Sequence, residues 1–284
     1  MQLRVLGPLQ VSTGDRVWSP GGPKERRLLA ILVLNIGEVV SVDALAEALW
    51  EGDPPRSAVK TLQVYVTRLR AALAARDVDA DLIRTVGRGY RLALAADAVD
   101  ALAFAQRVRR ARQALDDGAP QEAERQLVDA FGLWRGEPYG EFADGGWFAA
   151  EAQRLTEIRL AGLDVRLAAG LALGRDADVV AEAQALCAAH PMHEQFWVHL
   201  VTALYRSGRQ ADALAALRRV RTLLAEEIGA DPGVDLRALE RRVLSQDPAL
   251  TAPTHGSPAA SLPVELDPAG RPFFGRTQEL AWLD

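Results

Sequence analysis

Short apolar runs and glycine turns alternate over the first twenty residues, where Leu3–Leu6 and Leu9–Val11 are separated by Gly7-Pro8. This pattern predicts a small antiparallel sheet. The next segment, 23–35, is apolar on nearly all sides when wound as a helix, which predicts a buried helix that ends before Gly37.

Two amphipathic helices are expected next. Ser41 is a good N-cap for a helix whose apolar residues recur at i, i+3, i+4 and i+7 up to Trp50. Ser57 is expected to cap a third helix that runs to about Ala75. Residues 82–86 and 90–94 predict two strands joined by a glycine turn. Strands, three helices and a closing hairpin within residues 1–95 are typical of a winged helix-turn-helix domain.

Residues 97–247 show helical periodicity throughout. The motif Gly174-Arg-Asp-Ala-Asp178 returns as Gly208-Arg-Gln-Ala-Asp212, an offset of 34 residues, which is the period of tetratricopeptide helix pairs. Two copies predict a compact repeat-like bundle, so the fold class is α+β followed by all-α. Helices are expected over residues 100–116, 120–134, 147–172, 176–189, 194–206, 210–227 and 235–245.

The C-terminal part changes composition. Residues 248–272 are rich in proline and predict an extended linker. Residues 273–284 become apolar again, but this stretch is too short to fold alone.

Composition narrows the class of protein. Of the 284 residues, 49% are hydrophobic, which is enough for sizeable cores and excludes a wholly disordered chain. No apolar run approaches the ~20 residues of a membrane helix, and the N-terminus lacks a secretory signal pattern. A single cysteine, Cys187, fits a reducing cytoplasm. The net charge of −5 argues against nucleic acid, but residues 1–95 carry +3 and residues 96–284 carry −8. A basic first unit is compatible with local polyanion binding.

The third helix carries the best chemical signal. Residues 54–76 contain five basic side chains and no acidic one. At about 100° per residue, Leu62, Val66, Leu69 and Leu73 form a core stripe. Cations, an amide, a hydroxyl and a methyl-sized side chain on the other faces are the groups that read a major groove. The outward set is Lys60, Val64, Thr67 and Ala71, with Arg68 beside them and Gln63 and Arg70 on the opposite flank.

The predicted hairpin adds a second basic segment without acids, from Arg84 to Arg91, with Arg88 at the tip of a wing where it would reach a minor groove or phosphates. The alternative to DNA binding is a solvated basic helix face on a packing module. The order of helices and wing favours DNA.

Other chemistries have weaker support. Cys187, His190 and His193 have metal-ligand spacing, but Pro191 interrupts their helix and no fourth ligand is near in sequence. Phosphate-loop, nucleophile-elbow, HExxH and dinucleotide motifs are missing from the sequence, which predicts a protein that is not an enzyme and uses no cofactor. An aromatic-rich loop at residues 134–148 is either a partner-docking surface or a plug in the bundle, and the plug is favoured.

These motifs together resemble the Streptomyces antibiotic regulatory protein family over residues 1–250. The resemblance rests in the first unit on Leu6-Gly-Pro-Leu9, Gly21-Gly-Pro-Lys24, Val40–Leu45, Ala48-Leu-Trp50, Thr61–Arg70 and Gly89–Leu92. In the second unit it rests on Ala203–Leu214, Glu226–Gly233 and Leu236–Leu239.

The resemblance implies an OmpR/PhoB-type winged helix fused to a tetratricopeptide-like bacterial transcriptional activation domain. Such proteins activate secondary-metabolite genes by binding tandem direct repeats in promoters and recruiting RNA polymerase holoenzyme with its sigma factor. Because one small winged domain covers only a short half-site, a dimer is expected on DNA. The resemblance places Lys60, Tyr65, Thr67, Arg68 and Arg70 on the recognition helix and Thr85 and Arg88 on the wing, where Arg84 also lies. The loop of Glu51, Asp53, Pro54, Pro55 and Arg56 corresponds to the family's polymerase-contacting loop.

Two expectations concern the ends of the chain. No receiver domain precedes the winged helix, so phosphorylation of an upstream aspartate is not expected to be the switch. Residues 273–284 resemble the segment that opens a STAND-type nucleotide-binding domain in large family members, which suggests a piece of a longer regulator. Two rival functions remain: a protein-interaction scaffold, and a nucleotide-regulated switch in the full-length protein.

Overall fold

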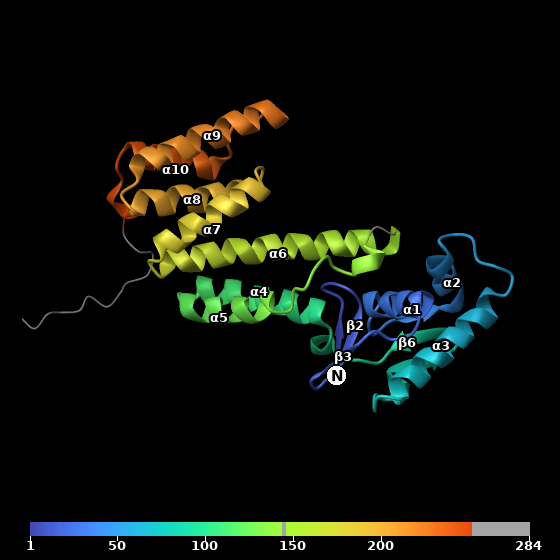
Figure 1. The fold of residues 1–284 in the computed structure, drawn as a ribbon. Helices are drawn as coiled ribbons and strands as arrows, with labels where there is room; N and C mark the ends of the chain where they lie inside the picture. Colours follow the sequence, from blue (N-terminus) through green and yellow to red (C-terminus); the bar gives the residue numbers. More distant parts are fainter. Residues whose placement is uncertain (144–145, 252–284) are drawn as a thin grey trace, which may run out of the picture. The chain divides into compact units, whose positions relative to one another are not determined.

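The N-terminal part contains two three-stranded antiparallel sheets and three helices (Figure 1). The computed structural model describes residues 1–143 and 146–251. The first sheet has the strand order β1-β2-β3 and the second has the order β4-β6-β5. The elements are β1 (Gln2–Arg4), β2 (Gln10–Thr13), β3 (Arg16–Trp18), α1 (Pro23–Leu34), β4 (Val39–Ser41), α2 (Val42–Trp50), α3 (Ala58–Ala74), β5 (Ile83–Val86) and β6 (Gly89–Leu92). The predicted winged helix is confirmed.

Capping explains where two of these helices begin. The Ser41 hydroxyl accepts a hydrogen bond from the Ala44 N–H at 3.1 Å, as expected for the N-cap of α2. Ser57 stands at the N-cap of α3, but its side chain makes no capping hydrogen bond. Its backbone carbonyl instead accepts from the Thr61 N–H at 2.9 Å.

Strand β4 was not predicted from the sequence. It pairs antiparallel with β6, and Val40 lies opposite Tyr90. A Cβ atom at Gly89 would lie 2.5 Å from the Val40 carbonyl oxygen, so only glycine allows this close approach. Gly89 was expected only to shape the hairpin turn. It therefore also allows β4 to pair with β6 as the third strand of the sheet that forms the wing.

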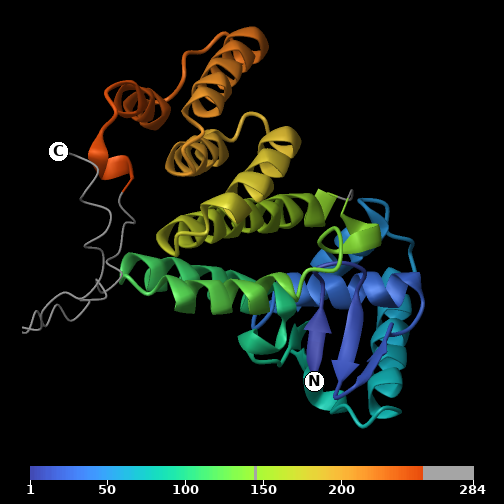
Figure 2. The same ribbon diagram turned by 60° about the vertical axis from the view of Figure 1, so that its left-hand side comes forward.

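Seven helices follow within the described residues, close to the predicted limits (Figures 1 and 2). They are α4 (Asp100–Asp116), α5 (Pro120–Phe131), α6 (Gly146–Ala172), α7 (Asp176–Ala189), α8 (Glu194–Arg206), α9 (Gln210–Ile228) and α10 (Val234–Leu244). Helix α5 ends three residues before the expected position.

The repeated turn occurs three times rather than twice. Gly118, Gly174 and Gly208 adopt left-handed φ angles of 76°, 71° and 74°. In each case the next residue donates its N–H to a carbonyl five residues before it, at 2.8–3.0 Å. The α4–α5 turn therefore has the same geometry as α6–α7 and α8–α9. Its sequence, Gly118-Ala-Pro-Gln-Glu, hides the repeat.

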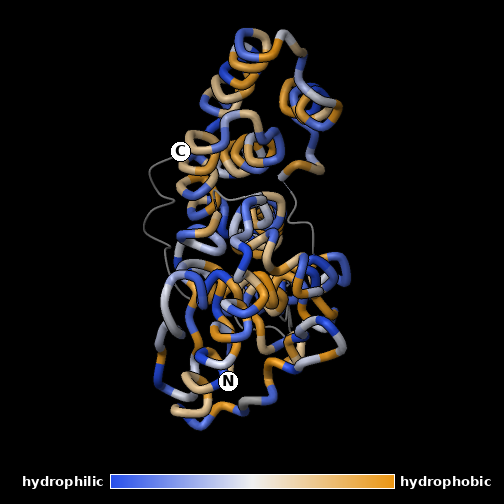
Figure 3. The backbone as a smooth tube through the Cα atoms, turned by 90° about the vertical axis from the view of Figure 1, so that its right-hand side faces the viewer, coloured by the Kyte–Doolittle hydropathy of each residue, from blue (hydrophilic) through white to orange (hydrophobic). Residues whose placement is uncertain are grey.

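Two apolar clusters fill these elements. One extends from the strands and helices of the winged helix into α4, α5 and one side of α6 from Phe148 to Ala169. The other joins Leu163, Leu167 and Leu171 of α6 to α7, α8, α9 and α10. Hydrophobic and hydrophilic positions alternate along most helices (Figure 3). Leu250 is buried in the second cluster within a short 3-10 turn. The linker assigned to 248–272 was therefore wrong for its first residues. The rest of it, and residues 273–284, lie outside the described residues.

Hydrogen bonds join the winged helix to the helical part at the connection between β1 and β2. Buried Asp100 accepts hydrogen bonds from the Val5 and Leu6 N–H groups at 2.7 and 3.1 Å. The backbone N–H groups of Arg135 and Tyr139 donate to the carbonyls of Leu6 and Val5 at 2.8 and 2.6 Å. The aromatic-rich loop therefore holds the winged helix as well as covering the bundle.

Candidate nucleic-acid interface

Helix α3 presents the predicted basic face to solvent. Its core stripe, Leu62, Val66, Leu69 and Leu73, is completely buried. All but one of the side chains that the sequence places outward are exposed. They are Lys60, Gln63, Val64, Thr67, Arg68 and Ala71. The helical periodicity thus gave the correct orientation.

Two of these side chains have partners within the domain. The Thr67 hydroxyl donates to the Gln63 carbonyl at 2.9 Å, which leaves its methyl group and an oxygen lone pair for contacts outside the helix. Arg68 Nη1 lies 3.4 Å from Glu25 Oε1, and the Arg68 side chain remains 65% exposed. Glu25, on α1, is buried beneath it. The carboxylate therefore restrains one edge of the guanidinium and leaves most of it accessible.

Arg70 contacts the wing. Its Nε and Nη2 atoms donate to the Ile83 carbonyl at 3.0 and 2.6 Å, and Nη2 also donates to the Thr85 hydroxyl at 2.9 Å. Its guanidinium lies 6.0 Å from the centroid of the Tyr90 ring. The sequence placed Arg70 on an outward flank, but the side chain is half-buried and bridges α3 to β5.

Tyr65 also lies away from the outward face. It is half-buried against the winged-helix core, and its ring stacks on Trp50 of α2 with centroids 6.4 Å apart. The family resemblance placed Tyr65 on the recognition helix, where it indeed lies, but its ring packs α3 against α2.

The wing is a tight hairpin with an exposed basic tip. Arg84, Thr85 and Arg88 are all exposed. Gly87 has a left-handed φ of 53°, which lets β5 reverse into β6. The Arg88 carbonyl accepts from the Val42 N–H at 3.0 Å, so the backbone of the tip is fixed to the start of α2.

The loop from α2 to α3 is exposed over its whole length, at Glu51, Asp53, Pro54, Pro55 and Arg56. Glu51 adopts a left-handed φ of 56° and its carboxylate lies 2.5 Å from Arg27 Nη1 on α1. The Asp53 N–H donates to the Trp50 carbonyl at 3.2 Å. The start of the loop is therefore fixed while its side chains remain accessible.

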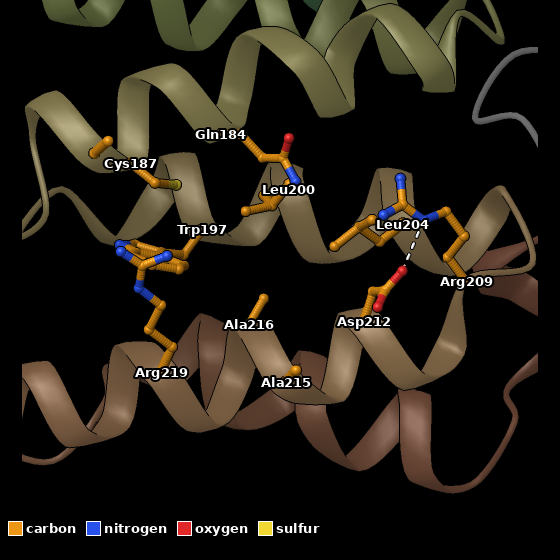
Figure 4. Close-up of a pocket in the computed structure, with 11 residues that line it drawn as sticks. Gln184, Cys187, Trp197, Leu200, Leu204, Arg209, Asp212, Ala215, Ala216 and Arg219 are labelled. Carbon is orange, nitrogen blue, oxygen red and sulfur yellow. Dashed lines mark hydrogen bonds and ion pairs between the residues drawn. The ribbon is translucent and has the colours of Figure 1, made fainter.

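A separate hollow of about 340 Å³ lies between α7, α8 and α9 (Figure 4). Arg219 extends over the Trp197 ring, with 5.8 Å between its guanidinium carbon and the ring centroid, and Arg209 pairs with Asp212 at 2.8 Å. Cys187 lines it but is nearly buried, and burial raises the pKa of its thiol to about 12. No cluster of metal-ligand type occurs among residues 1–143 and 146–251.

Within the same residues, none of the helices has the length and apolar character needed to cross a bilayer.

The fold and the α3 face define a winged-helix transcription regulator joined to a helical activation unit. Comparisons agree. A family model described as "Transcriptional regulatory protein, C terminal" matches residues 19–92, and one described as "Bacterial transcriptional activator domain" matches residues 99–244.

Three relatives each match more than nine tenths of this chain. The transcriptional regulatory protein EmbR of Mycobacterium tuberculosis is 37% identical over 280 residues, which are 98% of this chain and 72% of EmbR. Regulatory protein DnrI of Streptomyces peucetius is 35% identical over 92% of this chain and 98% of DnrI. Regulatory protein AfsR of Streptomyces coelicolor is 36% identical over 97% of this chain, but only 28% of AfsR is covered.

A solved structure, Mycobacterium tuberculosis EmbR in complex with a low affinity phosphopeptide, superposes with a TM-score of 0.83 at 36% identity, over 88% of this chain and 68% of that one. The chain therefore belongs to the Streptomyces antibiotic regulatory protein family and is a DNA-binding transcriptional activator of that type.

Proposed function

We propose that this protein binds tandem direct repeats in promoters of secondary-metabolite genes, antibiotic genes among them, and recruits RNA polymerase holoenzyme through contacts that include its sigma factor. The observation that carries this proposal is the exposed face of α3, which has no acidic side chain and lies beside a basic wing tip. A recognition helix with an adjacent wing is the standard arrangement for entering a major groove and contacting the neighbouring backbone.

We assign phosphate contacts and base contacts to different side chains of α3 and the wing according to their chemistry. Lys60, Arg84 and Arg88 neutralise phosphates and supply affinity that depends on salt. Arg68 hydrogen-bonds guanine and Gln63 hydrogen-bonds adenine, since each can make two hydrogen bonds to its base edge. The Thr67 methyl and Val64 provide apolar contacts to thymine methyl groups. Each good base contact contributes about 1–3 kcal/mol of discrimination.

Arg70 and Tyr65 position α3 through contacts inside the domain. Arg70 holds the wing strand at a fixed distance from α3, and Tyr65 fixes the angle between α3 and α2. We therefore expect Arg68→Ala to weaken the specific site more than random DNA. Arg70→Ala weakens both about equally, because its contacts hold the wing and read no base.

The α2–α3 loop is the proposed contact for polymerase. Its side chains are exposed and adjacent to the DNA-facing helix, so they remain accessible when α3 lies in the groove. Replacing Asp53 and Arg56 with alanine should leave DNA binding intact and lower run-off transcription. An unchanged transcript yield would exclude the loop as a polymerase contact.

The experiment that tests the proposal is selection of bound duplexes from a random DNA library by the full chain, with affinities measured by fluorescence anisotropy at several salt concentrations. Recovery of a repeated motif, with affinity that falls steeply with salt, supports direct-repeat binding by two or more copies. An enriched motif without repetition contradicts the tandem arrangement. Absence of binding at low salt would favour the protein-interaction scaffold.

A further inference from the structure

The outer face of the last helix, α10, combines aliphatic and basic side chains in an ordered stripe. Val234, Arg237, Arg241 and Leu244 are spaced by three, four and three residues, which places them within about 80° of one another on the helix. The opposite face is buried through Leu236, Leu239 and Val243. Val234 and Leu244 are 68% and 62% exposed, so the stripe begins and ends with aliphatic side chains in solvent.

The two arginines of this stripe have no acidic partner among the residues that the structure describes. They line a groove of about 510 Å³ between α9 and α10. Glu240, the acidic residue that lines it, is already paired with Arg221 of α9 at 2.5 Å. The groove is therefore positively charged, although residues 96–284 together carry a net charge of −8.

The spacing is that of the a and d positions of a helix-pairing seam, with aliphatic residues at the outer two and arginine at the inner two. Two copies of α10 cannot pair favourably along it. In an antiparallel pair Arg237 would face Arg241 of the second copy, and in a parallel pair each arginine would face its own equivalent. Like charges at such positions select against self-association.

A nucleic-acid backbone fits the stripe poorly as well. Phosphates would satisfy the arginines, but they would leave Val234 and Leu244 in water and would meet the carboxylate of Glu240. A protein helix with acidic residues at the two central positions and aliphatic residues at the two outer ones matches all four side chains. The stripe spans eleven residues, whose ends lie about 15 Å apart, so the matching helix needs about three turns.

We propose that this stripe, which we call the α10 seam, docks an acidic amphipathic helix of a partner protein with the pattern Leu-x-x-Glu-x-x-x-Glu-x-x-Leu. The pattern is symmetric, so the partner helix can lie parallel or antiparallel to α10. The inference goes beyond the proposed function, because it assigns to the activation unit a protein contact that is independent of the DNA-binding face.

The test uses the full 284-residue chain and a fluorescein-labelled helical peptide that carries this pattern. Anisotropy should show saturable binding that weakens at least tenfold when both glutamates are replaced by glutamine. The R237E/R241E variant should lose the acidic peptide at least tenfold and should bind the matching lysine peptide instead. Replacing the two leucines of the peptide with serine should also weaken binding.

The matched control is R109E/R110E, which makes the same change of charge at two exposed arginines of α4. It should bind the acidic peptide like the wild type. Three results would overturn the proposal: no saturable binding of the acidic peptide, equal loss in both double variants, or no gain of the lysine peptide by R237E/R241E. A loss of affinity for random duplex DNA in R237E/R241E alone would identify the seam as a nucleic-acid contact instead. Operator binding by the α3 face is measured separately and does not depend on any of these outcomes.

Discussion

Asp100, at the start of α4, makes direct side-chain hydrogen bonds from the helical part to the winged helix. Its carboxylate accepts two backbone N–H groups of the β1–β2 connection and lies 3.5 Å from Arg135 Nη2. Replacing it with alanine leaves two buried donors without an acceptor and removes the counter-charge of a largely buried arginine. Asp100→Ala should therefore be among the most destabilising substitutions in the chain.

The structure sets the size of this effect. Each buried N–H left unsatisfied costs about 1–3 kcal/mol, so the two together give about 2–6 kcal/mol. Burial itself opposes the carboxylate and raises the pKa of Asp100, although the hydrogen bonds from Val5 and Leu6 and the charge of Arg135 act to lower it. Because the wild type bears the cost of a buried charge, we expect a loss of about 3 kcal/mol in the free energy of unfolding. Asp100→Asn keeps one acceptor oxygen and should lose about half as much.

The raised pKa also predicts the dependence on pH. The folded protein binds a proton at Asp100 more readily than the unfolded chain, whose aspartate titrates near 3.8. Between that value and the raised pKa, lowering the pH stabilises the folded form. The stability advantage of the wild type over Asp100→Asn should therefore increase as the pH falls from 7 toward 4.

Urea unfolding monitored by circular dichroism measures these differences, and hydrogen exchange at the Val5 and Leu6 amides locates them. Asp97→Ala, at an exposed aspartate three residues earlier, is the matched control and should change stability by less than about 0.5 kcal/mol. Equal stability of the two alanine variants would refute the claim that the hydrogen bonds of Asp100 stabilise the contact between the winged helix and the helical part.

Three further predictions concern the wing and the bundle. Arg70→Ala should speed hydrogen exchange in β5 and lower the affinity for all duplexes alike, and a selective loss of the specific site would contradict its bracing role. Gly89→Ala should lower the melting temperature, since its Cβ would clash with the Val40 carbonyl and overpacking costs about 1–3 kcal/mol; an unchanged melting temperature would show that β4 can move aside. Burial would raise the pKa of Asp164, but the hydrogen bond from His199 at 2.7 Å and the nearby positive charge outweigh it and hold the pKa below its usual value. The stability difference between wild type and Asp164→Asn should therefore be fully present at pH 7 and decrease in urea titrations as the pH falls below 3.8, and a difference that grows as the pH falls below 3.8 would refute this.

Periodicity was sufficient to orient most helices. The spacing of Leu62, Val66, Leu69 and Leu73 fixes which side of α3 is buried, and therefore which side chains are left for DNA. The same local logic placed the limits of α4, α7 and α8 without error. These features depend on residues within a few turns of one another, which a single sequence displays directly.

Contacts between distant segments could not be predicted in this way. Strand β4 has three residues, and its partner β6 lies some fifty residues later, so no local pattern marks it. The orientation of Arg70 depends on a carbonyl in the wing, and the role of Asp100 depends on amides 94 and 95 residues before it. The third repeat turn, at Gly118, was hidden because its geometry depends on a left-handed residue and one backbone hydrogen bond, and not on the side chains that follow.

The central claim is that the outward face of α3 reads DNA sequence. The most direct measurement is the ratio of dissociation constants for random and selected duplexes, compared between the wild type and a variant with Gln63, Thr67 and Arg68 replaced by alanine. Arg109→Ala serves as the control for loss of a surface charge. If the claim is correct, the ratio falls at least tenfold in the triple variant, because each lost base contact costs about 1–3 kcal/mol, while circular dichroism and the control remain unchanged. A triple variant that folds normally and keeps the wild-type ratio would contradict the claim.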